Sequence, residues 1–204
     1  CEDMPTIAAK GIDVYYEQEG EGDNLLLIAG LGAHSGAWAL NRPAFAQKFR
    51  VTVFDNRGAG RTSAPDEPYS IRSMADDTAA LLRAIGIDRT HVLGASLGGF
   101  VAQELAINYP GLVDRLVLAC TRASTGELRR QVAIGQRALW ESGISREAIA
   151  AIQQPWTSST AVLQDPVKPL DALSMLSDDP YPIARHAYLG QLDAMLAHDT
   201  RDRL

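Results

Sequence analysis

The first 121 residues alternate between two patterns of apolar and polar positions. Short runs of β-branched and large apolar side chains are separated by segments whose apolar residues recur at helical spacing. Residues 11–18 alternate as a half-exposed strand does, whereas the later runs are continuously apolar, which is typical of strands buried on both faces. These later runs cover residues 25–28, 51–54, 91–93 and 113–119. Strands that alternate with helices predict an α/β fold, a mostly parallel sheet with helices on its faces.

Three helices are predicted between these strands. The most regular pattern covers residues 71–85, and Gly86 is placed to end that helix. A second helix is predicted to begin just after Ser96 and to stop where Pro110 disfavours helical geometry in the residue before it. A shorter helix is predicted over residues 36–48, and its internal proline is expected to limit its length.

The pattern changes near residue 121. Beyond it the β-branched runs disappear and amphipathic helical patterns follow. Prolines are expected to divide this part into short helices. They are Pro155, Pro166, Pro169, Pro180 and Pro182. We therefore expect two parts, with residues 1–121 forming the N-terminal part of a sheet core and residues 122–204 forming a helical cap or lid.

Composition narrows the range of functions. With 204 residues, 46% of them hydrophobic and 22% charged, the chain suits one globular domain or a core with a subdomain. The net charge of −6 offers no basic patch for nucleic acid. The most apolar run, residues 25–33, is far shorter than the roughly 20 residues that a membrane helix needs. Cys1 and Cys120 form no metal-ligand spacing and no disulfide framework. We expect a cytoplasmic protein without metal or cofactor that acts on a small molecule, and no pattern indicates its oligomeric state.

The most informative segment is residues 91–100, in which a short strand runs through Gly-x-Ser-x-Gly into a helix. This is the pattern of a nucleophile elbow, a tight turn that holds a serine exposed in strained backbone geometry. Gly94 and Gly98 would remove side chains that otherwise collide in such a turn. Ser96 is the predicted nucleophile, and the backbone amide of Leu97 at the helix N-terminus is a predicted oxyanion donor.

Two further glycine-rich loops follow predicted strands. In residues 27–33, Gly30 and Gly32 would let the backbone approach a substrate, and the amide of Leu31 is the predicted second oxyanion donor. The charged loop of residues 53–63 is interpreted as structural. Its aspartate and arginine, Asp55 and Arg57, can bond the amides and carbonyls of a tight glycine turn.

Together these three segments resemble the α/β-hydrolase superfamily, in particular its branch of enol-lactone hydrolases, esterases and cofactor-free haloperoxidases. The likeness covers residues 12–121. The Asp-x-Arg-Gly-x-Gly loop of the family matches residues 55–60, and its elbow matches residues 94–99. Where this branch has His-Gly in the oxyanion loop, Ala29 replaces the histidine and Gly30 remains, which keeps the backbone donor. The helical segment that follows resembles the cap that such enzymes insert after their sixth strand.

The resemblance also implies a catalytic acid and a catalytic histidine later in the chain, with further strands between them. No apolar β run follows residue 119, so we expect a chain truncated before both groups and inactive by itself. Among the histidines present, His34 lies nearest to the predicted oxyanion loop and is the remaining candidate for a base. Structural or surface roles are expected for His91, His186 and His198.

Other polar and aromatic side chains receive simpler interpretations. Asp76 and Asp77 are predicted on a solvated helix face, Asp114 at the sheet end remote from the elbow, and Cys120 as a small buried residue. The aromatic residues of the cap are expected to shape the pocket. They include Trp140, Trp156 and Tyr188.

The leading hypothesis is therefore a serine hydrolase of small carboxylic esters or lactones that forms an acyl-enzyme on Ser96. A carbon–carbon bond hydrolase or a perhydrolase would use the same residues. A noncatalytic member of the fold, or a ligand-binding module, is the alternative for this chain, and we expect its last strand to present an apolar edge. Dinucleotide binding is a weaker alternative. Gly30, Gly32 and Gly36 follow a strand and Asp55 ends the next one, but these glycines lack the tight spacing of the dinucleotide-binding motif.

Overall fold

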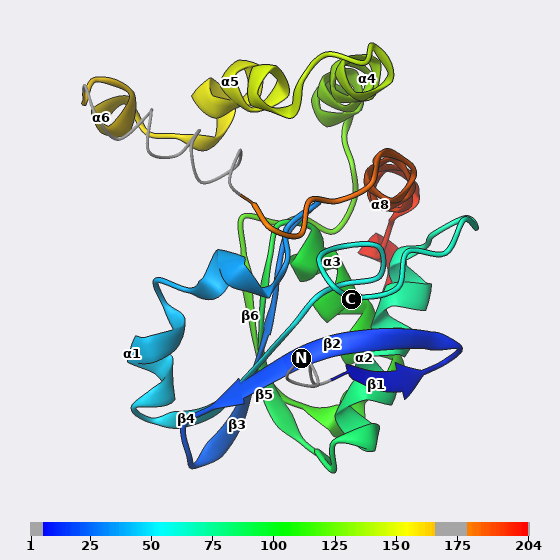
Figure 1. Ribbon diagram of the computed structural model, residues 1–204. Coiled ribbons are helices and arrows are strands. Elements are labelled where there is room, and N and C mark those ends of the chain that lie inside the picture. The colour runs from blue at the N-terminus through cyan, green and yellow to red at the C-terminus, as the bar shows by residue number, and fades with distance from the viewer. Residues whose placement is uncertain (1–5, 166–178, 204) are drawn as a thin grey trace.

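A computed structural model describes residues 6–165 and 179–203 of the chain (Figure 1). The described residues contain one six-stranded sheet in the order β1-β2-β4-β3-β5-β6. Its strands are β1 (Thr6–Ala9), β2 (Ile12–Glu19), β3 (Asp23–Ile28), β4 (Phe49–Phe54), β5 (Thr90–Ala95) and β6 (Val113–Ala119). The α-helices are α1 (Arg42–Ala46), α2 (Ile71–Ala84), α3 (Leu97–Asn108), α4 (Glu127–Glu141), α5 (Arg146–Thr157), α6 (Thr160–Leu163) and α8 (Arg185–Ala197). Three short 3₁₀ helices are η1 (Ser35–Trp38), η2 (Pro110–Leu112) and η3 (Arg201–Arg203).

Strand direction confirms the predicted α/β fold. The four neighbours β4, β3, β5 and β6 pair in parallel, while β1 and β2 pair antiparallel at one edge of the sheet. The five predicted strand runs correspond to β2 to β6, and only Gly11, at the start of the first run, lies outside its strand. Strand β1 was not predicted, because a four-residue edge strand carries too few positions to show a period; it joins β2 through a two-residue turn, Lys10-Gly11, in which both residues have positive φ.

Alternating side chains of the central strands build a core on each face of the sheet. Leu26 and Ile28 point into the larger core, which contains the buried faces of α2 and α3. Leu25 and Leu27 point into the smaller core, which is covered by η1 and α1. Helices from successive crossovers therefore cover opposite faces, as Figure 1 shows for α1 against α2 and α3.

The two long core helices begin and end as predicted. Ser70 caps α2 by accepting a hydrogen bond from the Ser73 N–H, and Gly86 follows the helix with φ of +74°. Helix α3 ends at Asn108, directly before Tyr109 and Pro110. The helix predicted over residues 36–48 is instead two pieces, η1 and α1. The proline lies in the first turn of α1, where its missing N–H costs no helical bond, so it helps to start a helix there and does not end one.

Burial of β6 differs from the prediction. Strand β6 was predicted to be buried on both faces, but within the described residues it pairs only with β5 and forms the edge of the sheet. Val117 is 54% exposed and Leu118 is 43% exposed. An apolar sequence pattern reports which side chains can be buried, whereas an edge position leaves them without a covering layer. The expected apolar edge is present.

The segment after residue 121 is helical, as predicted. Figure 1 shows α4, α5 and α6 beyond the carboxyl ends of the parallel strands, while α8 lies against the core. The larger core includes Ala187 and Leu192 of α8, each fully buried. Pro155 does not divide α5 but lies inside its last turns, and Pro166 and Pro169 fall outside the described residues. None of the helices described is both long enough and apolar enough to span a bilayer.

Candidate functional site

The sheet topology places two loops together at the carboxyl ends of β3 and β5. These strands are parallel neighbours, with Ile28 paired with Gly94 at their last residues. The chain leaves β3 towards η1 and α1 on one face and leaves β5 towards α3 on the other face. Neighbouring strands whose connections leave in opposite directions open a crevice at their carboxyl ends, which is where ligands bind in open α/β sheets.

Ser96 occupies a strained turn between β5 and α3. Its φ of 54° and ψ of −118° lie in a region that residues other than glycine rarely adopt. The turn is fixed on one side by the Ser96 N–H, which donates to the Ala119 carbonyl at 2.9 Å. The side chain is exposed, as predicted, and within the described residues no hydrogen bond involves its Oγ.

The two glycines of the turn are required by space. A Cβ on Gly94 would lie 2.3 Å from the Gly98 carbonyl oxygen, and a Cβ on Gly98 would lie 2.1 Å from the Ile28 carbonyl oxygen. Both obstacles are backbone atoms, which cannot move aside cheaply. This agrees with the prediction that Gly94 and Gly98 avoid collisions, and it explains how α3 can approach β3 so closely.

Two unpaired backbone N–H groups lie in the loops that meet at Ser96. Leu97 is the first residue of α3, so its N–H has no partner within the helix. The Leu31 N–H belongs to the loop after β3. In the described part of the chain, neither N–H donates to a protein acceptor. The partial positive charge of the α3 N-terminus adds to the attraction that Leu97 offers to an anion.

The loop after β3 is a tight turn pressed against Ser96. The Ala33 N–H donates to the Gly30 carbonyl at 3.2 Å, Gly32 has φ of +72°, and Leu31 has no positive φ. These values define a type II β-turn with Leu31 and Gly32 at its centre. A Cβ on Gly30 would lie 3.3 Å from Ser96 Cβ and 3.8 Å from Ser96 Oγ, so the missing side chain lets the turn touch the serine.

Gln191 of α8 joins this turn to the loop after β4, and sequence analysis did not single it out. Its Oε1 accepts from the Gly32 N–H at 2.9 Å, and its Nε2 donates to the Arg57 carbonyl at 2.8 Å. The side chain is fully buried. A signal was present in the sequence, because Gln191 lies at helical spacing between the apolar residues Tyr188 and Leu192 and is the polar residue of that buried face.

The charged loop after β4 is structural, as predicted. Asp55 is fully buried and accepts hydrogen bonds from the Ser35 N–H at 2.6 Å and from the Arg61 N–H at 2.9 Å. Arg61 Nε lies 3.2 Å from the same carboxylate. Both oxygens of Asp55 are therefore engaged within the fold, which argues against the ribose-binding role that a dinucleotide site would require.

The prediction for Asp77 is wrong. This residue does not lie on a solvated helix face but is 3% exposed, and its two carboxylate oxygens bind Arg57 Nε at 2.7 Å and Arg57 Nη2 at 2.9 Å. Asp76 is also engaged, with Lys10 at 3.0 Å and with the hydroxyl of Tyr109 at 2.7 Å. The two aspartates tie α2 to the loops around it, and the partners come from distant sequence positions that a helical pattern does not reveal.

The four histidines all have partners away from Ser96. His34 Nε2 lies 3.2 Å from Asp179 Oδ1, and its Nδ1 accepts from the Gly36 N–H, so both ring nitrogens of the remaining candidate base are engaged. His91 pairs with Asp114 at 3.2 Å, at the amino-terminal end of β5.

His186 and His198 have the surface and packing roles that were expected. His186 is exposed and its Nε2 lies 3.1 Å from the Ala64 carbonyl. His198 is buried against Phe100, and its Nδ1 lies 3.6 Å from Glu104. Burial lowers the pKa of His198, which the charge of Glu104 only partly offsets. Burial would raise the pKa of Glu104, but hydrogen bonds from Arg203 and Asn108 outweigh it and hold this pKa below its usual range.

Cys120 also differs from its expected role. It is exposed and has φ of +53°, whereas a small buried residue was predicted. It follows the edge strand β6, so it shares the incomplete covering of that strand. In the described residues, no three histidine, cysteine, aspartate or glutamate side chains gather as metal ligands would.

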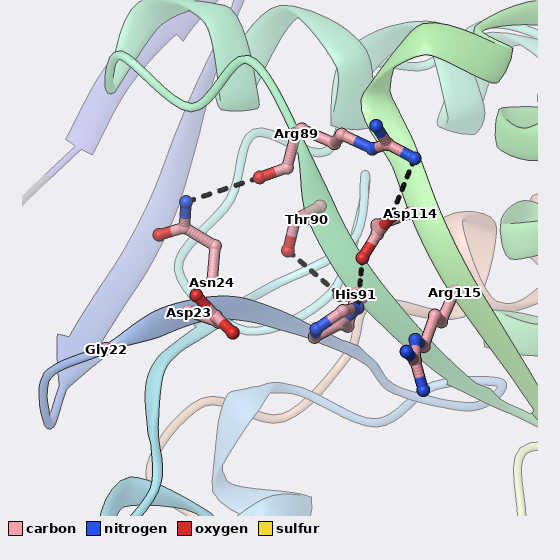
Figure 2. Close-up of a pocket in the computed structure, with 8 residues that line it drawn as sticks. All are labelled: Gly22, Asp23, Asn24, Arg89, Thr90, His91, Asp114 and Arg115. Atoms are coloured by element: carbon pink, nitrogen blue, oxygen red, sulfur yellow. Dashed lines mark hydrogen bonds and ion pairs between the residues drawn. The ribbon is translucent and has the colours of Figure 1, made fainter.

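A pocket of about 430 Å³ lies at the opposite end of the sheet from Ser96. Figure 2 shows Arg89 and His91 directed towards Asp114 at this end, at 2.6 and 3.2 Å. The pocket lies where β3, β5 and β6 begin, and ligands of parallel α/β sheets bind at the other end. The position of Asp114 and His91, remote from the elbow, agrees with the prediction.

Comparison with known proteins identifies the family. Residues 23–197 match the family model of the alpha/beta hydrolase fold. The chain is 32% identical over 207 residues to "Putative carbamate hydrolase RutD" of Azorhizobium caulinodans, covering 98% of this chain and 75% of that protein. Among further curated relatives, the match covers between 41% and 64% of their length.

Solved structures agree with this match. A hydrolase from Pseudomonas aeruginosa superimposes with a TM-score of 0.82 at 29% identity, over 99% of this chain and 76% of that one. Est816, described as an N-acyl homoserine lactone degrading enzyme, gives a TM-score of 0.70 at 26% identity, over 98% and 76% of the two chains. With its sheet order, its elbow and these matches, the chain belongs to the α/β-hydrolase fold family.

Proposed function

We propose that this chain carries the nucleophile of a serine hydrolase that cleaves small carboxylic esters or lactones. The observation that carries the proposal is the geometry of Ser96, an exposed hydroxyl on a strained turn with two unpaired backbone N–H groups in the adjoining loops. Strain of this kind persists only where the surrounding structure over-determines it, and such strain clusters at functional sites.

In the proposed reaction, Ser96 Oγ attacks the carbonyl carbon of the substrate and its proton passes to a base. The oxygen of the tetrahedral intermediate takes the negative charge and is bound by the N–H groups of Leu31 and Leu97. The ester C–O bond then breaks, the alcohol leaves with a proton, and an acyl group remains on Ser96. Water cleaves this acyl-enzyme and releases the acid. In a lactone the alcohol and the acid stay in one molecule.

The base is supplied by residues other than the four histidines of this chain. Each of those histidines has a hydrogen-bond or ion-pair partner elsewhere, and in the described residues no hydrogen bond joins any of them to Ser96. A serine without a base is a poor nucleophile at neutral pH. This observation favours the second candidate function for the chain by itself, a noncatalytic ligand-binding module.

We also infer that residues 1–121 are the N-terminal part of the hydrolase core and residues 122–204 its cap. Support comes from helices α4 to α6, which lie beyond the carboxyl ends of the strands (Figure 1). Tyr188 contacts the turn after β3, since a Cβ on Gly32 would lie 3.1 Å from its ring, and Trp140 stacks on Tyr188 at 4.0 Å. Trp156 is 74% exposed. Two of the three aromatic residues thus adjoin the proposed site.

The acyl substrate class is proposed from the site and from the relatives. Est816 degrades a lactone according to its description, and the Azorhizobium protein is named for a carbamate, which also presents a carbonyl to a nucleophile. A carbon–carbon bond hydrolase or perhydrolase would place the same serine at the same point.

A fluorophosphonate probe tests the proposal, because it reacts with activated serines. The chain is treated with the probe across a range of imidazole concentrations, since free imidazole can replace a missing base, and the modified residue is located by mass spectrometry. We expect labelling at Ser96 that rises with imidazole, no labelling of Ser96→Ala, and unchanged labelling of Ser142→Ala, which removes an exposed serine at the end of α4.

The same proteins, without the probe, are assayed for hydrolysis of p-nitrophenyl acetate at the same imidazole concentrations, with imidazole alone as the blank. Equal hydrolysis by the wild type and by Ser96→Ala, with no label on Ser96 at saturating imidazole, would contradict the proposal. That result would favour the ligand-binding module, because a pocket without an activatable serine can still bind an ester.

A further inference from the structure

We propose that Gln191 is a positioning residue: it holds the turn after β3 in the type II form and ties this turn to α8. The Leu31 N–H belongs to the peptide before the one that can flip, so Gln191 keeps it beside Ser96 by holding the whole turn in place. The proposal rests on the proposed function for its catalytic consequence, but not for the structural role itself. It assigns to Gln191 of helix α8, 159 residues from Gly32, control over the shape of the oxyanion site.

The turn after β3 could adopt either of two forms, type I or type II. The Gly30-Leu31-Gly32-Ala33 turn closes with the hydrogen bond from the Ala33 N–H to the Gly30 carbonyl in either form. Types I and II differ by a flip of the central peptide, between Leu31 and Gly32, which reverses the direction of the Gly32 N–H. The sequence allows both forms, because glycine tolerates either sign of φ.

The hydrogen bond between Gly32 and Gln191 distinguishes the two forms of the turn. In the observed turn the Gly32 N–H donates to Gln191 Oε1 at 2.9 Å. A flip of the peptide would turn this N–H away and bring the Leu31 carbonyl oxygen towards the amide oxygen of Gln191. The flip would therefore leave a buried acceptor unpaired and set two oxygens against each other, and both consequences are costly where water is absent.

The side chain of Gln191 is itself held in place by burial and by hydrogen bonds. Its side chain is 0% exposed, and its Nε2 donates to the Arg57 carbonyl at 2.8 Å, so both ends of the amide are bonded. The carbonyl that it binds belongs to a residue whose guanidinium is held by Asp77. The side-chain amide of Gln191 thus links α8 to the loops after β3 and β4. Its two hydrogen-bond partners set its orientation.

Helix α8 also packs over a glycine in each of the two loops that Gln191 joins. A Cβ on Gly58 would lie 2.8 Å from Ala187 Cβ, and a Cβ on Gly32 would lie 3.1 Å from the Tyr188 ring. Together with Gln191, these two residues form one face of α8. Loss of the glutamine therefore frees the turn without removing the helix that covers it.

The proposal is tested by nuclear magnetic resonance on the 204-residue chain, with Gln191→Met as the main variant. Methionine has a similar volume and no amide, so it removes both hydrogen bonds with little change in packing. We expect exchange of the Gly32 N–H with solvent to accelerate at least tenfold, and the backbone order parameter of Leu31 to fall. Exchange of the amides in α3 should not change.

Two further glutamines provide matched controls. Gln103→Met removes an equally buried amide, whose Nε2 binds the carbonyls of Gly99 and Arg122 and whose Oε1 binds Thr200, so it reproduces a general loss of stability. Gln131→Met changes an exposed residue of α4. Neither control should accelerate exchange at Gly32. A second variant, Gln191→Glu, keeps an acceptor for the Gly32 N–H and is expected to retain slow exchange there more fully than Gln191→Met.

Unchanged exchange at Gly32 and an unchanged order parameter at Leu31 in Gln191→Met would overturn the proposal. Equal acceleration in Gln103→Met would also overturn it, because the effect would then be general. If Gln191→Met fails to fold, Gln191→Asn decides the question by the same two readouts, because its side chain is one methylene too short to reach both partners. Faster exchange at Gly32 than in Gln103→Met would support the proposal, and equal exchange would overturn it.

The catalytic consequence is measured separately with the fluorophosphonate probe and imidazole. We expect the rate constant for labelling of Ser96 to fall between 10- and 100-fold in Gln191→Met, below the loss from deleting an oxyanion donor outright, while the imidazole dependence is unchanged. An unchanged rate would overturn the positioning role. A wild type that is not labelled would count against the proposed function, whereas exchange at Gly32 would still decide the role of Gln191 in the turn.

Discussion

The sheet and the helical segment that follows it use apolar residues in different ways. In β3, Leu26, Leu27 and Ile28 are completely buried, with a core on each face of the sheet. In α4 and α5, Leu128 is 78% exposed and Ile152 is 50% exposed. The side chains of the central strands are therefore closely packed on both faces. Within the helical segment, only α8 is packed as tightly as the sheet.

This contrast has a consequence at the proposed site. The strained backbone of Ser96 depends on the closely packed side, where glycines allow backbone atoms to meet. Helices α4 to α6 lie beyond the strand ends (Figure 1), and a Cβ on Gly135 of α4 or on Gly143 after it would meet no atom within 4 Å. We therefore expect substitutions on the sheet side to affect folding strongly and substitutions in α4 to be tolerated.

The largest effect is expected for Gly98→Ala. A Cβ here would lie 2.1 Å from the Ile28 carbonyl oxygen and 2.7 Å from the Ala29 carbonyl oxygen, so α3 must move away from β3. We expect the free energy of unfolding in urea to fall by at least about 3 kcal/mol. The control is Gly111→Ala, in η2 beyond the other end of α3 and with open space around its Cβ, and it should differ little from the wild type. Equal losses of stability in Gly98→Ala and Gly111→Ala would contradict the expectation that the close contact between α3 and β3 is especially sensitive to an added side chain.

An intermediate effect is expected where α8 ends against α3, and it depends on pH. Burial lowers the pKa of His198 below its ordinary value of 6.5, despite the nearby charge of Glu104. Between the lowered pKa of the folded chain and 6.5, the unfolded chain therefore binds a proton that the folded chain does not. The free energy of unfolding is highest above pH 6.5 and falls as the pH is lowered from 6.5 towards the pKa of the folded chain. A single proton contributes at most about 1.4 kcal/mol per pH unit.

Unfolding midpoints measured from pH 7.5 to pH 5 test this expectation. In His198→Phe, which keeps a ring against Phe100, stability should depend less on pH than in the wild type. The exposed residue His186 provides the control, and His186→Gln should retain the wild-type dependence. A slope that survives in His198→Phe between pH 7.5 and pH 5 would assign the pH dependence to other groups. Glu104 is not the first of these, because its lowered pKa changes stability only as the pH falls below about 4.5.

The smallest effect is expected for Gly135→Ala in the middle of α4, and it is stabilising. No atom lies within 4 Å of a Cβ at this position, and alanine loses less backbone entropy in a helix than glycine does. The free energy of unfolding should rise by about 0.5 to 1 kcal/mol if α4 unfolds together with the sheet. At Gly143, which has φ of +76°, the same substitution should destabilise instead. No change for Gly135→Ala would sharpen the contrast, since α4 would then unfold independently of the sheet.

Much of the fold was accessible from the sequence, because periodicity is a local property. The strand runs, the span of α2 with Gly86 at its end, and the start of α3 after Ser96 all follow from neighbours within a few positions. The family resemblance rested on loops whose residues are also contiguous, and the fold and the family are confirmed. The roles of Ser96, Leu31 and Leu97 stay predictions, although their geometry suits the proposed chemistry.

The sequence by itself determined that glycines flank Ser96 and that a buried strand precedes each candidate loop, since these features depend on local sterics and on the two-residue period of strands. The tertiary structure alone decided which polar groups meet. It buried Asp77 against Arg57, engaged both nitrogens of His34, and placed Gln191 on the turn after β3. Such contacts join residues far apart along the chain, so their energies depend on how the layers pack, which no pattern of neighbouring residues encodes.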